Sequence, residues 1–321
     1  MDKNSRIYIA GHRGLIGSAI LRKYKKIGFR NFLVKTRKEL DLMNQRKVEK
    51  FFLEEKPEYV MIAAGKIGGI KANMAYPAEF IYENVTVQNN IIWSSFKTNV
   101  KKLLYISCGC AYPTNSPQPI KETYLLKNIP EPTNEGFALA KILGIKLCEK
   151  INLEYKKNFI SCIPANTFGL NDHYDESRSH VISALIKKFH KAKVENLPSV
   201  RIWGTGIAKR EFIYVDDVAD ASVFLMDNFN PSKEEVGRGD VLINVGTGVD
   251  YSIAELADVV RTAVGYKGKI VWDTSKPNGM PRKLLDSSRL RAMGWRAKVH
   301  ILDGIRRTYQ WYLFIDLFYG I

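Results

Sequence analysis

Residues 6–17 read RIYIAGHRGLIG. The apolar run 6–10 predicts a buried strand, and the three regularly spaced glycines after it predict a tight turn that leads into an amphipathic helix over 18–26. Glycines at such a turn let the backbone approach a pyrophosphate, which then lies at the positive end of the helix. The spacing is G-x-x-G-x-x-G rather than the commoner G-x-G-x-x-G, but its place at the first strand-to-helix junction favours a dinucleotide-binding α/β fold.

The second expected strand, 31–34, ends in Lys35-Thr36-Arg37. A site that prefers NAD usually carries an acid at this point for the ribose hydroxyls. Two cations here, with Arg13 in the glycine-rich turn, favour a 2′-phosphate and therefore NADPH. The alternative is that Lys35 and Arg37 are simply exposed charges at a strand end.

Strands and helical segments continue to alternate as far as residue 163. Helices are expected over 46–55, 77–99 and 133–155, with strands over 59–63, 102–107 and 159–163. This order predicts a Rossmann-type doubly wound parallel sheet covered on both faces. We expect an NADP-binding domain over 1–170, with strands returning to it from about 207–250, and a smaller substrate domain mainly over 171–321.

The C-terminal part is less regular. The segment 164–169 reads as a polar turn, 172–178 as a loop, and 276–283 as a basic loop. Helices are expected to begin near residue 179, after Asp216 or Asp217 as a cap, and at the capping box formed by Ser252 and Glu255. The apolar run 309–321 is too short to span a bilayer and predicts a packing or subunit-contact helix.

Composition narrows the function classes. Forty-nine Lys and Arg against 33 Asp and Glu leave a net charge of +16, which favours anionic partners. The basic residues are spread along the chain, as on solvated helix faces, and no nucleic-acid module accompanies them. We therefore expect no nucleic-acid and no membrane partner. The four cysteines lack paired C-x-x-C spacing and no signal-peptide pattern is present, so we expect a reduced cytoplasmic setting and no metal site.

The helix expected over 133–155 places Phe137 and Lys141 four residues apart, on one face. A lysine at that place can sit beside a reacting carbonyl group. Phe137, one turn earlier, has no hydroxyl.

These features belong to a larger set of stretches that occur in one order along nearly the whole chain: GHRGLIGSAI, AAGKIGGI, PAEFIYEN, CAYP, PTNEGFALAKILGIKLCE, SHVISALIKKFH, WGTGIAKREFIYVDDVA, INVGTGVDYSI and SKPNGMPRKLLD. Together they resemble the extended short-chain dehydrogenase/reductase superfamily and, within it, GDP-L-fucose synthases and related GDP-sugar C4-reductases. The resemblance implies a GDP-linked 4-keto sugar as substrate, NADPH as cofactor and a homodimer formed through a helix bundle. The reaction it implies is epimerisation at C3 and C5, followed by reduction at C4.

The resemblance also implies roles for particular residues. Cys110 is the implied base and His180 the implied acid, residue types that can titrate near neutral pH. Lys141 matches the lysine of a Tyr-x-x-x-Lys motif, but Phe137 stands at the tyrosine position and Cys108 at the position of a serine that binds the carbonyl. Phenylalanine cannot donate a proton, and a thiol is a weaker donor than a hydroxyl. Ser107 is expected to point to the other side of its strand.

The remaining implied residues fall into two sets. Cofactor contacts are expected from Gly11, Arg13, Gly14, Leu15, Ile16, Gly17, Arg37, Asp41, Leu42, Ala63, Ala64, Gly65, Lys141, Pro164, Asn166 and His180. Substrate contacts are expected from Asn166, Lys188, Trp203, Arg210 and Lys283. Cys110 could be an ordinary buried thiol, but its place just past the end of a strand favours a catalytic role. Taken alone, His180 would more often be a cap or core residue, and Lys188, Arg210 and Lys283 would be surface charges.

Several readings stay open. Phe137 is either an introduced substitution or a natural loss or rerouting of the reduction step, and the retained Lys141 favours the first. Another reading is a C4-reductase that acts without epimerisation on a GDP-linked heptose or dideoxyhexose. A third is a catalytically silent protein that binds NADPH and a nucleotide sugar.

Overall fold

The centre of the molecule is a six-stranded sheet. The computed structural model describes residues 1–175, 179–276 and 278–319. The strand order is β2-β1-β3-β4-β5-β9, and every pair is parallel. The strands are β1 (Ile7–Ala10), β2 (Phe32–Leu33), β3 (Tyr59–Ile62), β4 (Lys102–Ile106), β5 (Phe159–Pro164) and β9 (Leu242–Val245). The predicted doubly wound α/β fold is confirmed.

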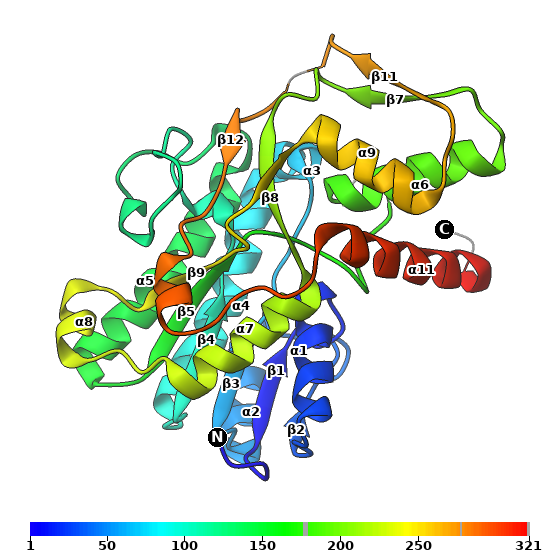
Figure 1. Cartoon of the computed structure of the whole chain (residues 1–321). Helices are drawn as coiled ribbons and strands as arrows, with labels where there is room; N and C mark the ends of the chain where they lie inside the picture. The colour runs from blue at the N-terminus through cyan, green and yellow to red at the C-terminus, as the bar shows by residue number, and fades with distance from the viewer. Residues whose placement is uncertain (176–178, 277, 320–321) are drawn as a thin grey trace.

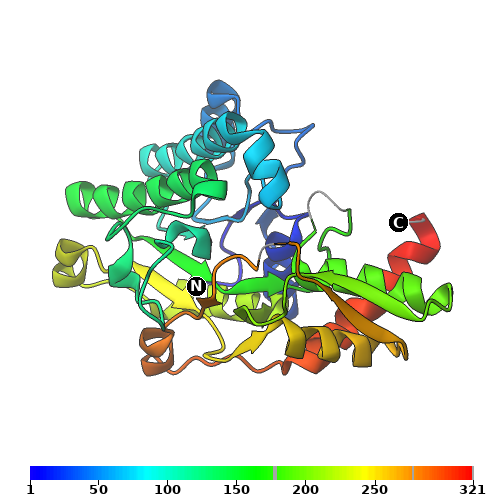
Figure 2. The same cartoon turned by 90° about the horizontal axis from the view of Figure 1, so that it is seen from above.

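Helices cover both faces of the sheet, as the fully buried apolar runs of its strands require. Figures 1 and 2 show one layer made of α4 and α5 side by side, and the opposite layer made of α1 and α7. The layers consist of α2 (Gln45–Glu55), α4 (Pro77–Lys97) and α5 (Glu135–Tyr155) on one face, and α1 (Leu15–Lys26) and α7 (Val215–Asn228) on the other. The bounds of α2, α4 and α5 lie within two residues of the predicted ones, and α1 begins three residues earlier than predicted.

A second group of elements lies beyond the carboxyl ends of these strands (Figure 1). It has its own buried apolar cluster, which includes Phe168, Phe189 and Ile305. It is built from β6 (Asn166–Phe168), β7 (Ser199–Trp203), β8 (Lys209–Tyr214), β10 (Asp250–Ser252), β11 (Lys269–Asp273), β12 (Arg282–Lys283), α6 (Val181–Val194), α9 (Ile253–Val264) and α11 (Ile301–Tyr319). The short helices α3 (Ile70–Ala75), α8 (Lys233–Arg238) and α10 (Ser288–Ala292) complete the described chain.

Three local predictions are wrong. The segment 164–169 is not only a turn, because β6 pairs in parallel with β8. Helix α7 is not capped by an aspartate: Tyr214 is its N-cap, and Asp217 instead accepts the backbone N–H groups of Lys298 and Val299. The basic loop 276–283 ends in β12, which pairs with β8. In each case pairing with a distant segment overrides the local signal.

Other local predictions hold. Ser252 and Glu255 form the expected capping box of α9. The structure describes the predicted loop 172–178 only as far as residue 175, and Pro277, Gly320 and Ile321 also lie outside the described residues. Within the described chain, none of the helices has the length and apolar character needed to cross a membrane.

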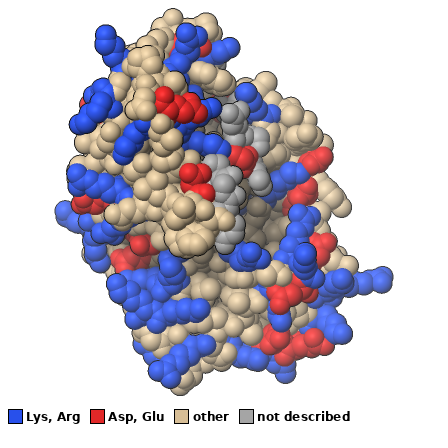
Figure 3. Space-filling model, turned by 90° about the vertical axis from the view of Figure 1, so that its right-hand side faces the viewer, with Lys and Arg blue, Asp and Glu red and all other residues tan. Residues whose placement is uncertain are grey.

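The positive charge is dispersed on the face shown in Figure 3. Lys and Arg side chains occur there in separate groups, with Asp and Glu between them. This arrangement agrees with solvated helix faces on that side of the molecule.

Candidate active site

A cavity of about 940 Å³ opens at the carboxyl ends of the parallel strands, and both groups of elements line it. The chain runs from β1 outward to β2 and then returns to β3 on the other side of β1. Doubly wound sheets bind ligands in the crevice that such a reversal leaves. The cavity is therefore at the place where this topology is expected to bind a ligand.

The glycine-rich turn forms one wall of the cavity. Gly11 has a φ of +84°, and a Cβ there would lie 2.7 Å from the carbonyl oxygen of Ala63. A Cβ at Gly17 would lie 2.2 Å from the carbonyl oxygen of Gly11. Only glycine fits these two positions, so the turn brings its backbone and the start of α1 close to the cavity.

Cations gather at the end of the cavity beside β2. This β2 end consists of Arg13, Lys35, Thr36 and Arg37, all of which line the cavity. The nearby acid Glu39 is turned to the backbone N–H and hydroxyl of Thr36, both at 2.7 Å, and does not line the cavity. Within the described ranges no carboxylate pairs with any of the three cations. The β2 end thus offers uncompensated positive charge to an anionic group.

Lys141 lies deep in the cavity, on the second turn of α5. Its Nζ lies 3.4 Å from the carbonyl oxygen of Ile106 and 5.1 Å from the centre of the Tyr105 ring. The same Nζ lies 5.7 Å from the centre of the Phe137 ring, so the predicted spacing does place both side chains together. Burial lowers the pKa of Lys141, while the nearby cysteines act in the opposite direction.

Cys108 and Cys110 lie just beyond β4, where the short helix η1 (Gly109–Ala111) begins. The two thiols influence each other's pKa in opposite directions. Interaction with the Cys110 thiol, together with the charges of Lys141 and Lys283, lowers the pKa of Cys108 to about 6. Interaction with the Cys108 thiol, together with burial, raises the pKa of Cys110. We call Cys108, Cys110, Lys141 and Lys283 the cysteine–lysine cluster; the two shifts favour a thiolate on Cys108 and a thiol on Cys110.

Phe137 has no polar atom to offer the cavity. Its ring packs edge-on against Phe80, with ring centres 6.0 Å apart. Ser107 also lines the cavity, contrary to the expectation that it points away, because β4 ends at Ile106 and strand alternation no longer applies. Its hydroxyl is buried and has no hydrogen-bond partner within the described residues.

His180 is the N-cap of α6 and reaches the cavity from the second group of elements. Its Nδ1 lies 3.1 Å from Oδ1 of Asp172, whose side chain is almost fully buried. Burial opposes the charged ring, but the hydrogen bond and negative charge of Asp172 outweigh it and raise the pKa of His180. This arrangement favours a protonated imidazole beside the cavity.

Two further cations approach from neighbouring strands. Arg210 on β8 and Lys283 on β12 are paired in register, and burial lowers the pKa of both. No carboxylate pairs with either in the described part of the chain. Together they form a second cationic site, separate in the sequence from the β2 end.

Glu211, next to Arg210, is a buried residue that sequence reasoning missed. Its carboxylate accepts the backbone N–H groups of Gly248 at 2.7 Å and Leu285 at 2.9 Å, and burial raises its pKa. It thereby ties β8 to the segment that carries Lys283. The sequence feature that could have revealed Glu211 is an acidic residue inside the apolar run of β8. No sequence feature could have revealed the role of Asp172, because only the folded chain brings it to His180.

Most of the predicted site residues meet in this cavity. Those that line it are Gly11, Arg13, Gly14, Leu15, Ile16, Arg37, Asp41, Leu42, Ala63, Ala64, Gly65, Cys108, Cys110, Phe137, Lys141, Pro164, Asn166, His180, Arg210 and Lys283. Gly17 instead packs against the turn itself. Lys188 and Trp203 lie outside the lining: Lys188 bonds the carbonyl of Arg201, and exposed Trp203 lies between Lys71 and Lys276.

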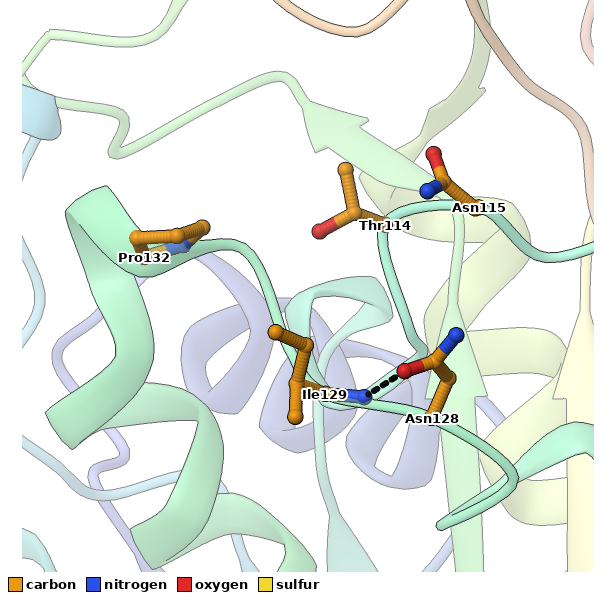
Figure 4. A pocket seen from close by; sticks show the side chains of 5 residues that line it. All are labelled: Thr114, Asn115, Asn128, Ile129 and Pro132. Atoms are coloured by element: carbon orange, nitrogen blue, oxygen red, sulfur yellow. Dashed lines mark hydrogen bonds between the residues drawn. The ribbon is translucent and has the colours of Figure 1, made fainter.

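A smaller pocket of about 250 Å³ lies under the proline-rich loop that precedes α5 (Figure 4). Its lining consists of Thr114, Asn115, Asn128, Ile129 and Pro132. The side chain of Asn128 accepts the backbone N–H of Ile129 at 2.8 Å, so its polar group serves the loop itself. The pocket contains no charged side chain, unlike the main cavity.

The sequence was compared with protein-family models. A model of the NAD dependent epimerase/dehydratase family matches residues 7–246, which include the whole six-stranded sheet. The chain belongs to this family. Nearly all residues that line the cavity lie within the matched range. The exceptions are Ile253, Lys283 and Leu285.

Within the epimerase/dehydratase family, the chain is similar to enzymes whose names refer to GDP-sugars. GDP-L-fucose synthase 1 of Arabidopsis thaliana is 48% identical over 312 residues, covering 97% of this chain and 94% of that protein. A GDP-6-OMe-4-keto-L-xylo-heptose reductase from C. jejuni superposes with a TM-score of 0.92 at 41% identity, over 98% of this chain and 99% of that one. A GDP-mannoheptose C4 reductase from Campylobacter jejuni with NADP bound superposes with a TM-score of 0.90 at 43% identity, with the same coverage. The resemblance stated from the sequence is confirmed.

Proposed function

We propose that this protein reduces the C4 carbonyl of a GDP-linked 4-keto-6-deoxy sugar with NADPH. Its relatives support an NADP-dependent oxidoreductase that acts on GDP-sugars, as the sequence predicted. The structural observation that carries the proposal is one cavity lined by cations in two places, without paired carboxylates among the described residues, and by the buried Lys141. Two phosphorylated ligands, a dinucleotide and a nucleoside-diphosphate sugar, fit that distribution of charge.

The glycine-rich turn and the β2 end fit NADPH. The turn leaves no room for a Cβ at Gly11 or Gly17, which suits a backbone that approaches a pyrophosphate. Arg13, Lys35 and Arg37 would hold the 2′-phosphate. When bound, NADPH supplies the hydride for C4. Lys141 would orient the nicotinamide ribose and hold positive charge near the carbonyl oxygen as negative charge develops on it.

Arg210 and Lys283 would bind the diphosphate or the sugar of the second ligand. Their strands are held together by Glu211, which keeps the two cations side by side. Lys188 and Trp203 remain proposed substrate contacts, at the outer side of the same group of elements. The second group of elements would thus be the substrate domain.

Epimerisation at C3 and C5 is the finer part of the proposal. A 4-keto group acidifies the neighbouring C–H bonds, so a thiolate of the cysteine pair can take a proton from one face. His180, held protonated by Asp172, can return a proton to the other face. The predicted base is Cys110, yet the thiolate of the pair is favoured on Cys108. Because the two thiols are coupled, the charge can also be carried by Cys110.

Restoring the tyrosine tests the reduction step. With GDP-4-keto-6-deoxymannose and NADPH, we expect Phe137→Tyr to speed cofactor oxidation by about 10²- to 10⁴-fold, the usual worth of a positioned general acid. Adding Lys141→Met to that variant should remove the gain, because the lysine lowers the tyrosine pKa. Absence of any gain from Phe137→Tyr would favour a silent protein, provided that the variant still binds NADPH and GDP by titration calorimetry.

A GDP-linked heptose is the second candidate substrate. Two solved structures with TM-scores of 0.90 or more are reductases of GDP-heptoses. Proton exchange at C3 and C5 in D₂O without NADPH separates the two reactions. Deuterium uptake requires a working base, whereas a C4-reductase without epimerisation takes up none before reduction.

Assembly and setting complete the proposal. We expect a cytoplasmic homodimer that supplies sugars for capsular or other surface polysaccharide. Helices α4 and α5 support the dimer, because they pack together and expose Tyr82, Trp93, Leu139 and Leu143. Light scattering should give twice the chain mass, and Leu143→Glu should reduce it to the mass of one chain; a monomer without the substitution would exclude this assembly.

A further inference from the structure

The cysteine–lysine cluster holds two thiols, whereas the proposed epimerisation requires only one thiolate base. The resemblance to GDP-sugar reductases implies a serine at position 108, and this chain has Cys108-Gly109-Cys110 instead. Both cysteines are free and half-buried, and both line the main cavity. Their proximity therefore calls for its own explanation.

The local backbone brings the two side chains into disulfide range. Residues two apart span at most about 7 Å when the chain is fully extended. Here Gly109 begins the helix η1, and the backbone N–H of Ala111 bonds the carbonyl of Cys108 at 3.1 Å, so the segment is folded and shorter. Disulfides form at Cα separations of about 4.4 to 6.8 Å. The thiol of each cysteine has the largest effect on the pKa of the other, as expected for side chains that lie next to each other.

The surroundings favour oxidation at this pair over the other two cysteines. A thiolate is the form that reacts with peroxides. Lys141 and Lys283 supply positive charge around Cys108, and Lys283 Cε lies 3.0 Å from the position of a Cβ on Gly109. By contrast, burial raises the pKa of Cys148 and of Cys162 to about 12. Those two thiols are buried in the core and do not line the cavity.

We propose that Cys108 and Cys110 form a reversible disulfide when a hydroperoxide reaches the cavity, and that this bond switches the site off. The thiolate attacks the peroxide oxygen, which gives a sulfenic acid and releases hydroxide. The second sulfur then attacks the sulfenic sulfur, and the hydroxyl group leaves as water with the remaining thiol proton. The two sulfur atoms lose two electrons, and one hydrogen peroxide becomes one water molecule and one hydroxide ion, which takes a proton from the solvent. A dithiol reverses the reaction by exchange.

The effect on activity rests on the proposed function, but formation of the bond does not. In the disulfide neither sulfur can accept a proton from C3 or C5, so exchange at both carbons stops. The predicted contact of residue 108 with the sugar carbonyl is lost as well. Reduction with dithiothreitol restores proton exchange and this contact.

Peptide mapping tests the bond directly. The full chain is treated with a slight excess of hydrogen peroxide, denatured, alkylated and digested with trypsin. One peptide, 103–121, contains both cysteines and no internal Lys or Arg. We expect it to lose two hydrogen atoms and to take up no alkylating reagent until dithiothreitol is added, while the peptides with Cys148 and Cys162 stay fully alkylated. Cys108→Ser should abolish the two-hydrogen loss.

Two outcomes would overturn the proposal: a peptide 103–121 that stays doubly alkylated, or one whose sulfurs are oxidised separately to sulfinic acid. The deuterium-exchange assay on the same samples forms a separate arm. If the disulfide forms but the untreated protein shows no exchange with either GDP-4-keto sugar, the proposed epimerisation fails and the modification site stands.

Discussion

The β2 end of the cavity and the cysteine–lysine cluster are built in opposite ways. The β2 end takes its cations from two short stretches near the start of the chain, and its Arg13 and Arg37 are exposed to solvent. The cluster gathers Cys108, Cys110, Lys141 and Lys283 from three distant segments. Burial, hydrogen bonding and mutual charge change the pKa values of all four.

This difference suits the β2 end to binding an anionic group and the cysteine–lysine cluster to chemical reaction. An exposed cation needs only to be present and unpaired in order to attract a phosphate group. A reactive thiol needs an environment that stabilises its charged form, and only groups brought together by the fold supply that environment. Substitutions in the cluster should therefore change rates strongly, and substitutions at the β2 end should change cofactor selection.

Cys110→Ala should cause the largest effect. Removing the predicted base is expected to slow deuterium incorporation at C3 and C5 of the GDP-4-keto sugar by about 10²- to 10⁴-fold. NADPH affinity should stay unchanged, because Cys110 belongs to the cluster and not to the β2 end. Mass spectrometry of the sugar measures exchange, and Arg37→Ala is the matched control that should exchange normally. Undiminished exchange in Cys110→Ala would place the base on Cys108.

Arg37→Ala should have an intermediate effect, confined to the cofactor. Loss of a guanidinium–phosphate contact of about 1.5 to 3 kcal/mol should weaken NADPH binding by about ten- to a hundredfold and leave NADH binding unchanged. Fluorescence titration with NADPH and with NADH measures the ratio of the two dissociation constants. Lys38→Ala is the control, since Lys38 is exposed beside Arg37 and does not line the cavity. An equal loss for both cofactors would contradict the assignment of the 2′-phosphate to the β2 end.

Asp172→Asn should have the smallest effect, a displacement of the pH profile. Exchange needs a thiolate and a protonated imidazole, so its rate should rise with pH through about 6, the pKa of Cys108, and fall above the ordinary histidine value of 6.5. Asparagine removes the charge that raises the pKa of His180, and the falling limb should move to lower pH. Rates measured across about pH 5 to 9 locate both limbs.

An unchanged falling limb in Asp172→Asn would exclude His180 as the acid.

The interaction between Asp172 and His180 also affects the pH dependence of stability. Because its folded pKa is raised, His180 contributes stability that is fully present below pH 6.5 and lost as the pH rises through the folded value. Thermal melts with and without Asp172→Asn should therefore differ more at low pH than at high pH.

Much of the glycine-rich turn and the β2 end was predictable because the sequence signals for them are local. The glycines, Lys35 and Arg37 follow their strands directly, and Phe137 and Lys141 share a helix face by spacing alone. The predictions that were wrong concern segments whose partners are distant: β6 and β12 both pair with β8. Asp217 serves the backbone of Lys298 and Val299 instead of capping α7. No local pattern specifies such pairings.

The amino-acid sequence by itself determined the doubly wound sheet, the glycine-rich turn, the cationic β2 end and the absence of a hydroxyl at position 137. These follow from residue types at fixed short spacings, which the backbone converts directly into geometry. Only the tertiary structure decided that Cys108 and Cys110 lie beside Lys141 and Lys283, and that Asp172 raises the pKa of His180. Proximity and burial set those pKa values, and both arise only when distant segments pack together.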